Sequence, residues 1–322
     1  MSDYNIFSYG AMMADDIRMS AYRAALEQAV KPGAVVLDIG AGQGIFSFVA
    51  CRLGASRVFA IELNDVIHVA REVAKANGFA DRITFIQEDS RNVRLPEAAD
   101  VLVSDLRGVL PILGDHFGTI ADARERLLKP GGAQIPLQDT LFAAVAAAPS
   151  GRDSYLGGFT AHNLGFDFSR ATIAATSLPW KVQLEPSQLL SSPAQLATFD
   201  YTAIHTLEIE TQLNFSINNA ASADGILLWF DAVLLSGIGF STAPGNKTVY
   251  GQGMLPWPQS VALQPHDQVH VTIVVKLFDE KAVWSWKTTI TRGNDRIYSF
   301  DQSSLPSQIH SAARLRDLAR KL

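Results

Sequence analysis

The chain has 322 residues, enough for two domains of ordinary size. Hydrophobic residues make up 48% of it and charged residues 18%, a composition that supports large cores and excludes a disordered chain. The formal net charge of −5 argues against a protein that coats nucleic acid, and a single cysteine, Cys51, excludes a disulfide framework. The first ten residues lack the regions of a signal peptide and no uncharged apolar run could span a bilayer, so we expect a cytoplasmic protein.

The first part of the chain alternates strand and helix patterns. Short apolar runs rich in β-branched residues predict buried strands at 34–40, 57–62, 83–88 and 99–105. Helical periods lie between them, for example at 46–53 and 65–77, and a helix that stops at two glycines is expected at 124–130. Because buried strands that alternate with helices form a parallel sheet covered on both faces, this part predicts an α/β domain.

The pattern changes after about residue 136. Runs that alternate apolar and polar residues predict strands at 202–213, 226–235, 269–278 and 283–291. Clusters of turn residues separate these runs, so we expect an antiparallel sheet or barrel. The last residues, 306–322, have helical spacing with several basic side chains and predict a terminal helix.

The strongest local motif follows the first predicted strand, where Asp38 is followed by glycines at positions 40, 42 and 44. Glycines let the backbone turn tightly and approach a ligand closely. A dinucleotide-binding loop would have glycine or alanine at the position of Ile45, and the negative charge of Asp38 disfavours a pyrophosphate. The same charge suits the sulfonium and ammonium groups of S-adenosylmethionine, so Asp38, Gly40 and Gly42 are predicted to bind that cofactor.

Polar side chains also end the next two predicted strands. Glu62, 24 residues after Asp38, is placed to accept hydrogen bonds from both hydroxyls of a ribose. Asp89 and Ser90 end the third strand, where we expect an adenine amino group. The alternative is that these residues only cap loops. Acids at three successive strand ends favour the cofactor site.

The run from Met12 to Tyr22 resembles the M-x-x-D-x-x-R-x-x-x-Y helix of the protein arginine methyltransferase family. The other matching segments are Ser104-Asp105, 128–136 and 239–244. The resemblance implies that Arg18 clamps the cofactor carboxylate, because a guanidinium can hold a carboxylate with two hydrogen bonds. It also implies that Tyr9 belongs to an aromatic helix that covers the cofactor.

The same resemblance implies the domain organisation. It predicts a helical cap over 1–30, a Rossmann-like class I methyltransferase domain over 31–140, and an antiparallel β-barrel-like domain over 141–322 that binds the acceptor. We therefore expect the fold class α/β plus β. The assembly implied by the family is a homodimer.

The sequence departs from the family at the positions that bind the acceptor. The family holds a guanidinium between two glutamates nine residues apart, and here those positions are Asp105 and Gly114. Asp115 and His116 are the nearest groups that could replace the second acid, and with Asp105 they form the predicted catalytic set. The family's Thr-His-Trp motif is matched to Leu255-Pro256-Trp257.

A guanidinium beside one carboxylate is only half paired, so these departures favour a neutral acceptor. We predict an S-adenosylmethionine-dependent N-methyltransferase that acts on an amide or amine of a peptide or protein side chain rather than on generic arginine. The alternatives are a true protein arginine methyltransferase, a small-molecule N- or O-methyltransferase, and a partner subunit that binds the cofactor without catalysis. The seven histidines have no metal-ligand spacing, and neither a metal site nor a nucleic-acid or membrane partner is expected.

Overall fold

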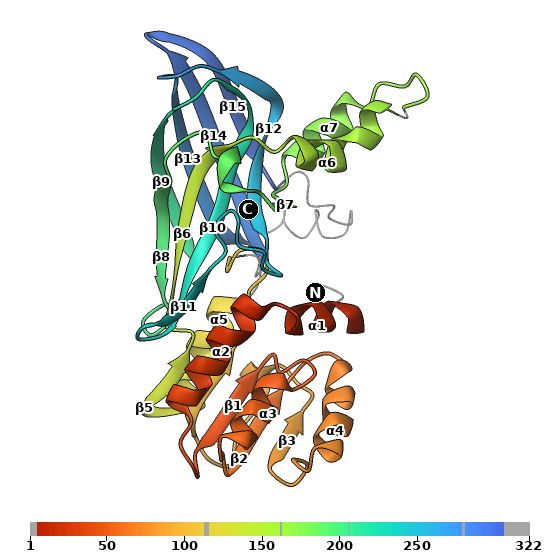
Figure 1. Cartoon of the computed structure of the whole chain (residues 1–322), viewed down its shortest axis with the longest axis vertical. Coiled ribbons are helices and arrows are strands. Elements are labelled where there is room, and N and C mark those ends of the chain that lie inside the picture. The colour runs from red at the N-terminus through yellow and green to blue at the C-terminus, as the bar shows by residue number, and fades with distance from the viewer. Residues whose placement is uncertain (1–4, 113–115, 162, 206, 279–280, 306–322) are drawn as a thin grey trace, which may run out of the picture. The chain divides into compact units, whose positions relative to one another are not determined.

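A computed structural model describes residues 5–112, 116–161, 163–205, 207–278 and 281–305 (Figure 1). The chain divides into two compact units. Unit 1 comprises 1–141, 197–207 and 229–251, and unit 2 comprises 142–196, 208–228 and 252–322. In the described part of the chain, no helix has the length and apolar character needed to cross a bilayer.

Unit 1 contains a five-stranded parallel sheet in the order β3-β2-β1-β4-β5. Its strands are β1 (Val35–Ile39), β2 (Arg57–Ile61), β3 (Ile83–Ile86), β4 (Ala99–Ser104) and β5 (Leu128–Ile135). The helices of this part are α1 (Ile6–Met13), α2 (Asp16–Ala29), α3 (Ile45–Arg52), α4 (Val66–Ala76) and α5 (His116–Arg126), with a short 3-10 turn η1 (Ser90–Asn92). The first four strands lie where the sequence predicts them.

One predicted boundary in this sheet is wrong. The helix expected at 124–130 begins earlier, at His116, and ends at Arg126, and Leu128–Ile135 is a strand. Pro130 and the glycines after it suggested a stop, but an edge strand accommodates proline because one side of its backbone has no strand partner. Strand β5 is such an edge strand, paired only with β4.

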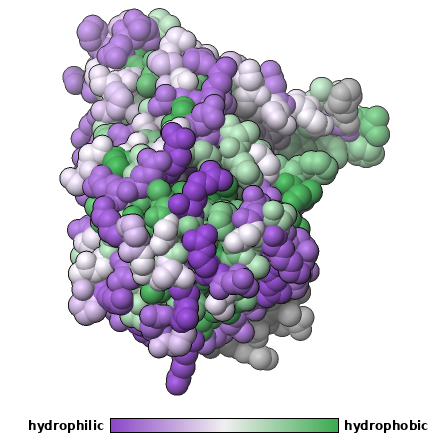
Figure 2. Space-filling model, turned by 60° about the horizontal axis from the view of Figure 1, so that its bottom comes forward, coloured by the Kyte–Doolittle hydropathy of each residue, from purple (hydrophilic) through white to green (hydrophobic). Residues whose placement is uncertain are grey.

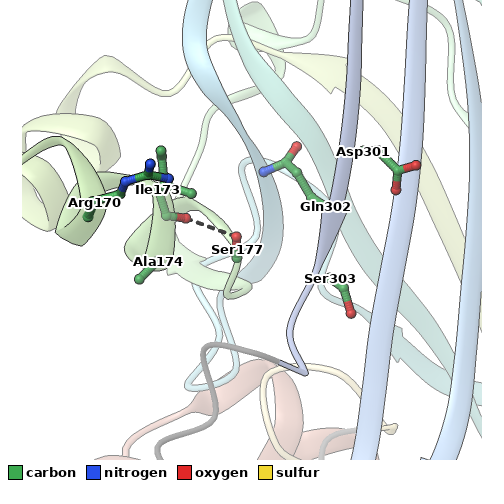
Figure 3. Close-up of a pocket in the computed structure, with 7 residues that line it drawn as sticks. All are labelled: Arg170, Ile173, Ala174, Ser177, Asp301, Gln302 and Ser303. Carbon is green, nitrogen blue, oxygen red and sulfur yellow. Dashed lines mark hydrogen bonds between the residues drawn. The ribbon is translucent and has the colours of Figure 1, made fainter.

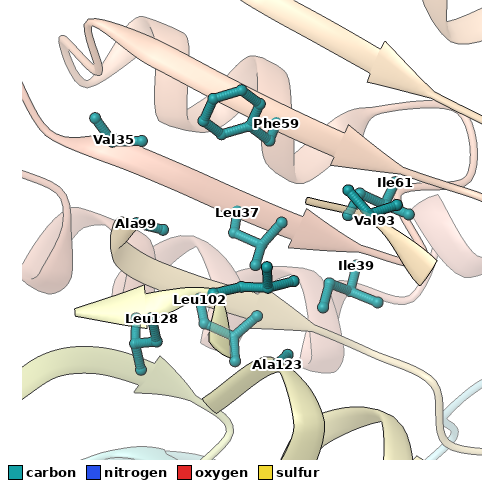
Figure 4. Close-up of a cluster of buried hydrophobic side chains, with 11 residues drawn as sticks. Val35, Leu37, Ile39, Phe59, Ile61, Val93, Ala99, Leu102, Ala123 and Leu128 are labelled. Atoms are coloured by element: carbon teal, nitrogen blue, oxygen red, sulfur yellow. The ribbon is translucent and has the colours of Figure 1, made fainter. Parts of the chain in front are cut away.

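A hydrophobic cluster packs along the strands of the parallel sheet, from their first residues to their carboxyl ends (Figure 4). Alternate residues of β1, Val35, Leu37 and Ile39, point to the same side and pack with buried side chains of the neighbouring strands. Ala123 of α5 lies in the same cluster. The ends of β1, β2 and β4, which carry the predicted site residues, are therefore anchored by a packed core.

Antiparallel strands are present in the second half of the chain as predicted, but the strand expected at 202–213 begins later, at Glu208, after a turn at 201–203. One sheet has the order β15-β14-β13-β9 and another the order β7-β12-β10-β6-β8, with β11 paired to β10. The strands are β6 (Gln138–Ala146), β7 (Trp180–Val182), β8 (Ala194–Asp200), β9 (Glu208–Ser216), β10 (Ala221–Leu235), β11 (Ile238–Ser241), β12 (Gln252–Leu263), β13 (Gln268–Phe278), β14 (Lys281–Arg292) and β15 (Asp295–Ser303). The fold class, α/β plus an antiparallel β domain, is as predicted. The terminal helix expected at 306–322 lies outside the described residues.

Two helices of unit 2, α6 (Pro149–Ala161) and α7 (Ser169–Thr176), were not predicted. They pack on each other and project from the strands of their unit (Figure 1). A further 3-10 turn, η2 (Pro186–Gln188), follows β7. Helix α6 contains three glycines, which lower its intrinsic helix propensity, so its sequence has a weak helical signal.

The side-chain amide of Gln302 joins several elements of unit 2. It is 6% exposed, donates to the carbonyl oxygens of Thr176 (2.7 Å) and Pro256 (2.9 Å), and accepts from the indole of Trp286 (2.9 Å). We expect Gln302→Met to lower the free energy of unfolding by about 2–4 kcal/mol, because it leaves buried polar groups without partners. Urea unfolding measures the loss. Gln268→Met, which removes amide hydrogen bonds at the surface, is the control, and equal losses for the two variants would contradict this account.

Candidate functional site

The loop after β1 is tied to the start of α3 by Asp38. Its Oδ2 accepts hydrogen bonds from the backbone nitrogen (3.0 Å) and the hydroxyl (2.7 Å) of Ser47. Its Oδ1 is also buried and has no hydrogen-bond partner in the part of the chain that the structure describes. Burial raises the pKa of Asp38 to about 7, although the bonds from Ser47 act in the opposite direction. An unsatisfied buried carboxylate oxygen favours a ligand that brings a donor or a positive charge.

Gly42, Glu62 and Tyr9 come together at the same loop. The Gly42 nitrogen donates to Glu62 Oε2 (2.9 Å), and the Asn64 nitrogen donates to Oε1 (2.9 Å). Gly42 has a φ of 54°, and a Cβ there would lie 2.7 Å from the ring of Tyr9. At Gly40, whose φ is 72°, a Cβ would collide with Leu106. The loop therefore needs glycine, and α1 supplies an aromatic ring close to it.

Asp89 and Ser90 lie after β3, as expected from the sequence. The carboxylate of Asp89 caps η1 and forms an ion pair with Arg91 (2.6 Å). Ser90 is buried, and its carbonyl oxygen accepts from Arg126 (3.0 Å). These contacts are those of loop capping, the alternative that the sequence left open, and a role in adenine binding stays a prediction.

A buried carboxylate, Asp105, lies just after β4 and is bound by three side chains. Its Oδ2 accepts from Arg18 Nε (2.5 Å) and from the Tyr250 hydroxyl (2.6 Å), and its Oδ1 accepts from Arg107 Nη1 (3.3 Å). Burial alone would raise the pKa of Asp105, but the charges of Arg18 and Arg107 and the hydrogen bonds from Tyr250 and Arg18 hold it below its usual value. Asp105 is therefore an ionised group inside unit 1.

Arg18 extends from α2 toward this carboxylate and is 6% exposed. Its Nη1 donates to the carbonyl oxygen of Met12 (3.1 Å). Its Nη2 has no hydrogen-bond partner among the residues that the structure describes, so it can bind a further anion. The predicted clamp on a cofactor carboxylate remains a prediction, and it would act through Nη2 rather than through the whole fork of the guanidinium.

Arg107 extends the ionic network further into unit 1. It donates to both carboxylate oxygens of Asp139, from Nε (2.6 Å) and Nη2 (2.7 Å), and to the hydroxyl of Tyr22 (2.7 Å). The Tyr201 hydroxyl donates to Asp139 as well (2.6 Å). Arg107 and Asp139 have no exposed side-chain surface, and each is paired by charge-assisted hydrogen bonds.

Of the two other predicted catalytic residues, only His116 is described; Asp115 lies outside the described residues. His116 is 1% exposed, and its ring meets that of Tyr201 edge to face with 4.9 Å between the centroids. Burial, and then the charge of Arg107, lowers the pKa of His116 to about 3. The imidazole is therefore neutral near pH 7, and its catalytic role stays a prediction.

Sequence reasoning missed Tyr250, Asp139 and Tyr201. Tyr250 is separated from Asp105 by 145 residues, and Asp139 from Arg107 by 32, so no local spacing links them. The expected barrel motif was also matched to the wrong residues. The segment that approaches the N-terminal helix is 249–250, because the Val249 nitrogen donates to Asp15 Oδ2 (2.7 Å).

Unit 2 contains a separate cavity of about 340 Å³ between α7 and β15 (Figure 3). It is lined by Arg170, Ile173, Ala174, Ser177, Asp301, Gln302 and Ser303. The amide of Gln302 is already fully hydrogen-bonded, and the Ser177 hydroxyl donates to the Ile173 carbonyl oxygen (2.9 Å). None of the residues predicted to bind cofactor or acceptor lines this cavity.

Comparison with known proteins gives two family matches. Residues 22–136 match "Ribosomal protein L11 methyltransferase (PrmA)", and residues 158–283 match "Arginine methyltransferase oligomerization subdomain". A solved enzyme–prozyme heterotetramer of Trypanosoma brucei PRMT1 with AdoHcy has a TM-score of 0.80 at 21% identity, covering 92% of this chain and 97% of that chain. At that identity the likeness shows the fold.

Two curated relatives are more similar in sequence. "Arginine N(omega)-methyltransferase" of Streptomyces achromogenes subsp. streptozoticus is 32% identical over 269 residues, which are 79% of this chain and 72% of that protein. "Probable protein arginine N-methyltransferase 6" of Arabidopsis thaliana is 31% identical over 229 residues, 68% of this chain. The chain spans about half, 52%, of that plant relative.

These relatives overturn the predicted preference for a neutral amide or amine, because both are named for arginine. The wrong prediction depended on the absence of a second acid at 114 and of a histidine at 255–257. Position 114 lies outside the described residues, and the segment that reaches Asp15 and Asp105 is 249–250, where Tyr250 supplies a polar group. The resemblance itself is confirmed: the chain belongs to the protein arginine methyltransferase family and carries the class I methyltransferase fold.

Proposed function

We propose that this chain transfers a methyl group from S-adenosylmethionine to a guanidinium nitrogen of arginine in a peptide or protein. The observation that carries the proposal is the buried, ionised carboxylate of Asp105, hydrogen-bonded to Arg18 at the carboxyl edge of the parallel sheet. A carboxylate is the natural partner of a guanidinium, which it can bind and orient through charge-assisted hydrogen bonds. The names of both relatives support arginine as the acceptor, and that of the Arabidopsis relative supports arginine in a protein.

The residues at the glycine loop fit the cofactor. Gly40 and Gly42 have the positive φ angles of a close turn, and Glu62 lies beside the loop with its carboxylate fixed by backbone amides. The unsatisfied Oδ1 of Asp38 suits a positively charged group, and the guanidinium of Arg18 suits a carboxylate. Bound S-adenosylmethionine supplies a methyl group on a sulfonium sulfur. The chain of the T. brucei structure, solved with AdoHcy, shares this fold.

Asp105 orients the acceptor. A carboxylate with a lowered pKa is a weak base, so its contribution is to hold the guanidinium in line with the methyl group rather than to keep the released proton. Within the described part of the chain its Oδ1 has one hydrogen bond, from Arg107 at 3.3 Å, and retains capacity to accept a further one. The acceptor therefore approaches Asp105 from the Oδ1 side.

We expect Asp105→Asn to reduce kcat for an arginine-containing peptide by about 100-fold or more, because an amide has one acceptor oxygen where a carboxylate has two and so loses part of its hold on the guanidinium. Cofactor affinity, measured by calorimetry, should change by no more than a few-fold. A matched peptide with lysine in place of arginine is the control, and free arginine forms a third arm that distinguishes a small-molecule acceptor. Turnover of the lysine peptide, or wild-type rates in the variant, would contradict the proposal.

Asp38 makes cofactor affinity depend on pH. Its pKa of about 7 means that it is largely protonated below neutrality, and a bound cation favours the ionised form. Binding should therefore tighten by about tenfold as the pH rises from about 5.5 to 7. Calorimetry with the wild type should show this trend and Asp38→Asn should show a flat profile. The same slope in both proteins would remove Asp38 from the cofactor site.

A homo-oligomer is also proposed, through the projecting helices of unit 2. Residues 158–283 match the oligomerization subdomain. Large apolar side chains are exposed on α6 and α7 and in the segment that connects them. Leu164 is 89% exposed, Phe166 68% and Ile173 51%, and hydrophobic side chains are visible at the surface in Figure 2. Such an exposed apolar group favours burial against another protein surface.

We expect the double variant Leu164→Ser and Phe166→Ser to shift the protein from dimer to monomer in sedimentation velocity, because apolar area that the dimer buries is lost. Leu277→Ser, a change of an exposed leucine on β13, is the control and should leave the assembly unchanged. A wild type that is monomeric at about 10 μM, where a specific dimer should persist, would refute the proposed oligomer.

A further inference from the structure

Neither the cofactor binding nor the acceptor binding proposed above explains why Arg107 is buried in the ionic network around Asp105. It follows Asp105 by two residues, and its side chain has no exposed surface. It is bound to both oxygens of Asp139, to the hydroxyl of Tyr22 and to Asp105 Oδ1. Every one of these partners lies in unit 1.

We propose that Arg107, anchored by Asp139, is a positioning residue that holds the carboxylate of Asp105 in the orientation needed to bind the acceptor. This inference rests on the proposed function. In this role Arg107 orients the carboxylate of Asp105 and does not itself contact substrate or cofactor.

The loop itself has little backbone support. Residues 105–112 form neither helix nor strand, and no backbone–backbone hydrogen bond joins them to another described part of the chain. Leu110 and Ile112 are fully buried, but apolar packing is not directional. The two parallel hydrogen bonds between Arg107 and Asp139 are directional, so they fix the loop relative to β6.

The contacts of Asp105 divide between its two oxygens. Arg18 and Tyr250 hold Oδ2, and of the residues that the structure describes only Arg107 reaches Oδ1. Two oxygens held from different directions fix the rotation of the carboxylate about its last torsion angle, which is otherwise broad. Loss of the Arg107 contact frees Oδ1, the oxygen that faces the acceptor in the proposed function.

A buried ion pair by itself is a weak source of stability, and an uncharged pair of similar volume often folds as well. Removal of one partner is costly, because the other charge is left buried without compensation. A test must therefore separate loss of folding from loss of positioning. When Arg107 and Asp139 are both replaced, no unpaired charge remains between them. Any loss of activity that persists then reports the orientation of Asp105.

The experiment compares Arg107→Met, Arg107→Lys, and Arg107→Met combined with Asp139→Asn, in which the asparagine still accepts a hydrogen bond from Tyr201. We expect Arg107→Met to unfold at a lower temperature and the double variant to regain most of the loss. The double variant should still show kcat/KM for the arginine peptide reduced by about 30–100-fold, the effect of a misplacement of about 1 Å. Cofactor affinity should stay within about twofold, and Arg107→Lys should recover part of the activity because it keeps a charged donor near Asp105.

Arg292→Met is the matched control. It breaks the ion pair with Asp267, a buried acid of unit 2, and should lower stability without changing kcat/KM for the peptide. Recovery of full activity together with stability in the double variant would overturn the inference, as would an equal loss of cofactor affinity. Absence of turnover by the wild type would instead overturn the proposed function, so the two failures are distinguishable.

Discussion

The buried carboxylate of Asp105 is the feature on which the rest of this structure depends. An ionised group inside a protein is tolerated only when other groups offset its charge, and here Arg18, Arg107 and Tyr250 do so. These partners come from α2, from the loop after β4 and from the segment after β11. Three separate parts of unit 1 therefore meet at this one carboxylate. It links Arg18, the predicted clamp of the cofactor carboxylate, to the site predicted to bind the acceptor.

The fold supplies what this arrangement needs. Parallel strands present their carboxyl ends at one edge, and a packed cluster of apolar side chains along the strands holds those ends in place. Asp38, Glu62 and Asp105 each follow or end one of these strands. Arg107 and Asp139 carry the network away from the edge and make it electrically neutral, with two arginines against two aspartates. Pairing avoids the large cost of leaving one of these buried charges without a partner.

Much of the methyltransferase core could be predicted from the sequence, because its signals are local. Buried parallel strands are continuous apolar runs, and the glycines after Asp38 mark the loop directly. The contacts of Tyr250 and Asp139 could not be predicted, since they join residues far apart in the chain. Helix α6 was missed because its three glycines weaken the helical pattern, and the stacked rings of Tyr155 and Trp180 help to hold it against β7. Helix α7 is only eight residues long, which gives it a weak periodic signal. The prediction of a neutral acceptor was wrong because it gave more weight to the missing acid at 114 and the missing histidine at 255–257 than to the carboxylate of Asp105, which is present.

The most direct test of the account is to locate the transferred methyl group. The purified chain is incubated with S-adenosylmethionine carrying a deuterated methyl group and a peptide that offers arginine, lysine, glutamine and asparagine together. Tandem mass spectrometry then assigns the label to an atom class. The account predicts the label on a guanidinium nitrogen of arginine and on no other side chain. Label on a lysine amine or on a glutamine or asparagine amide would contradict it.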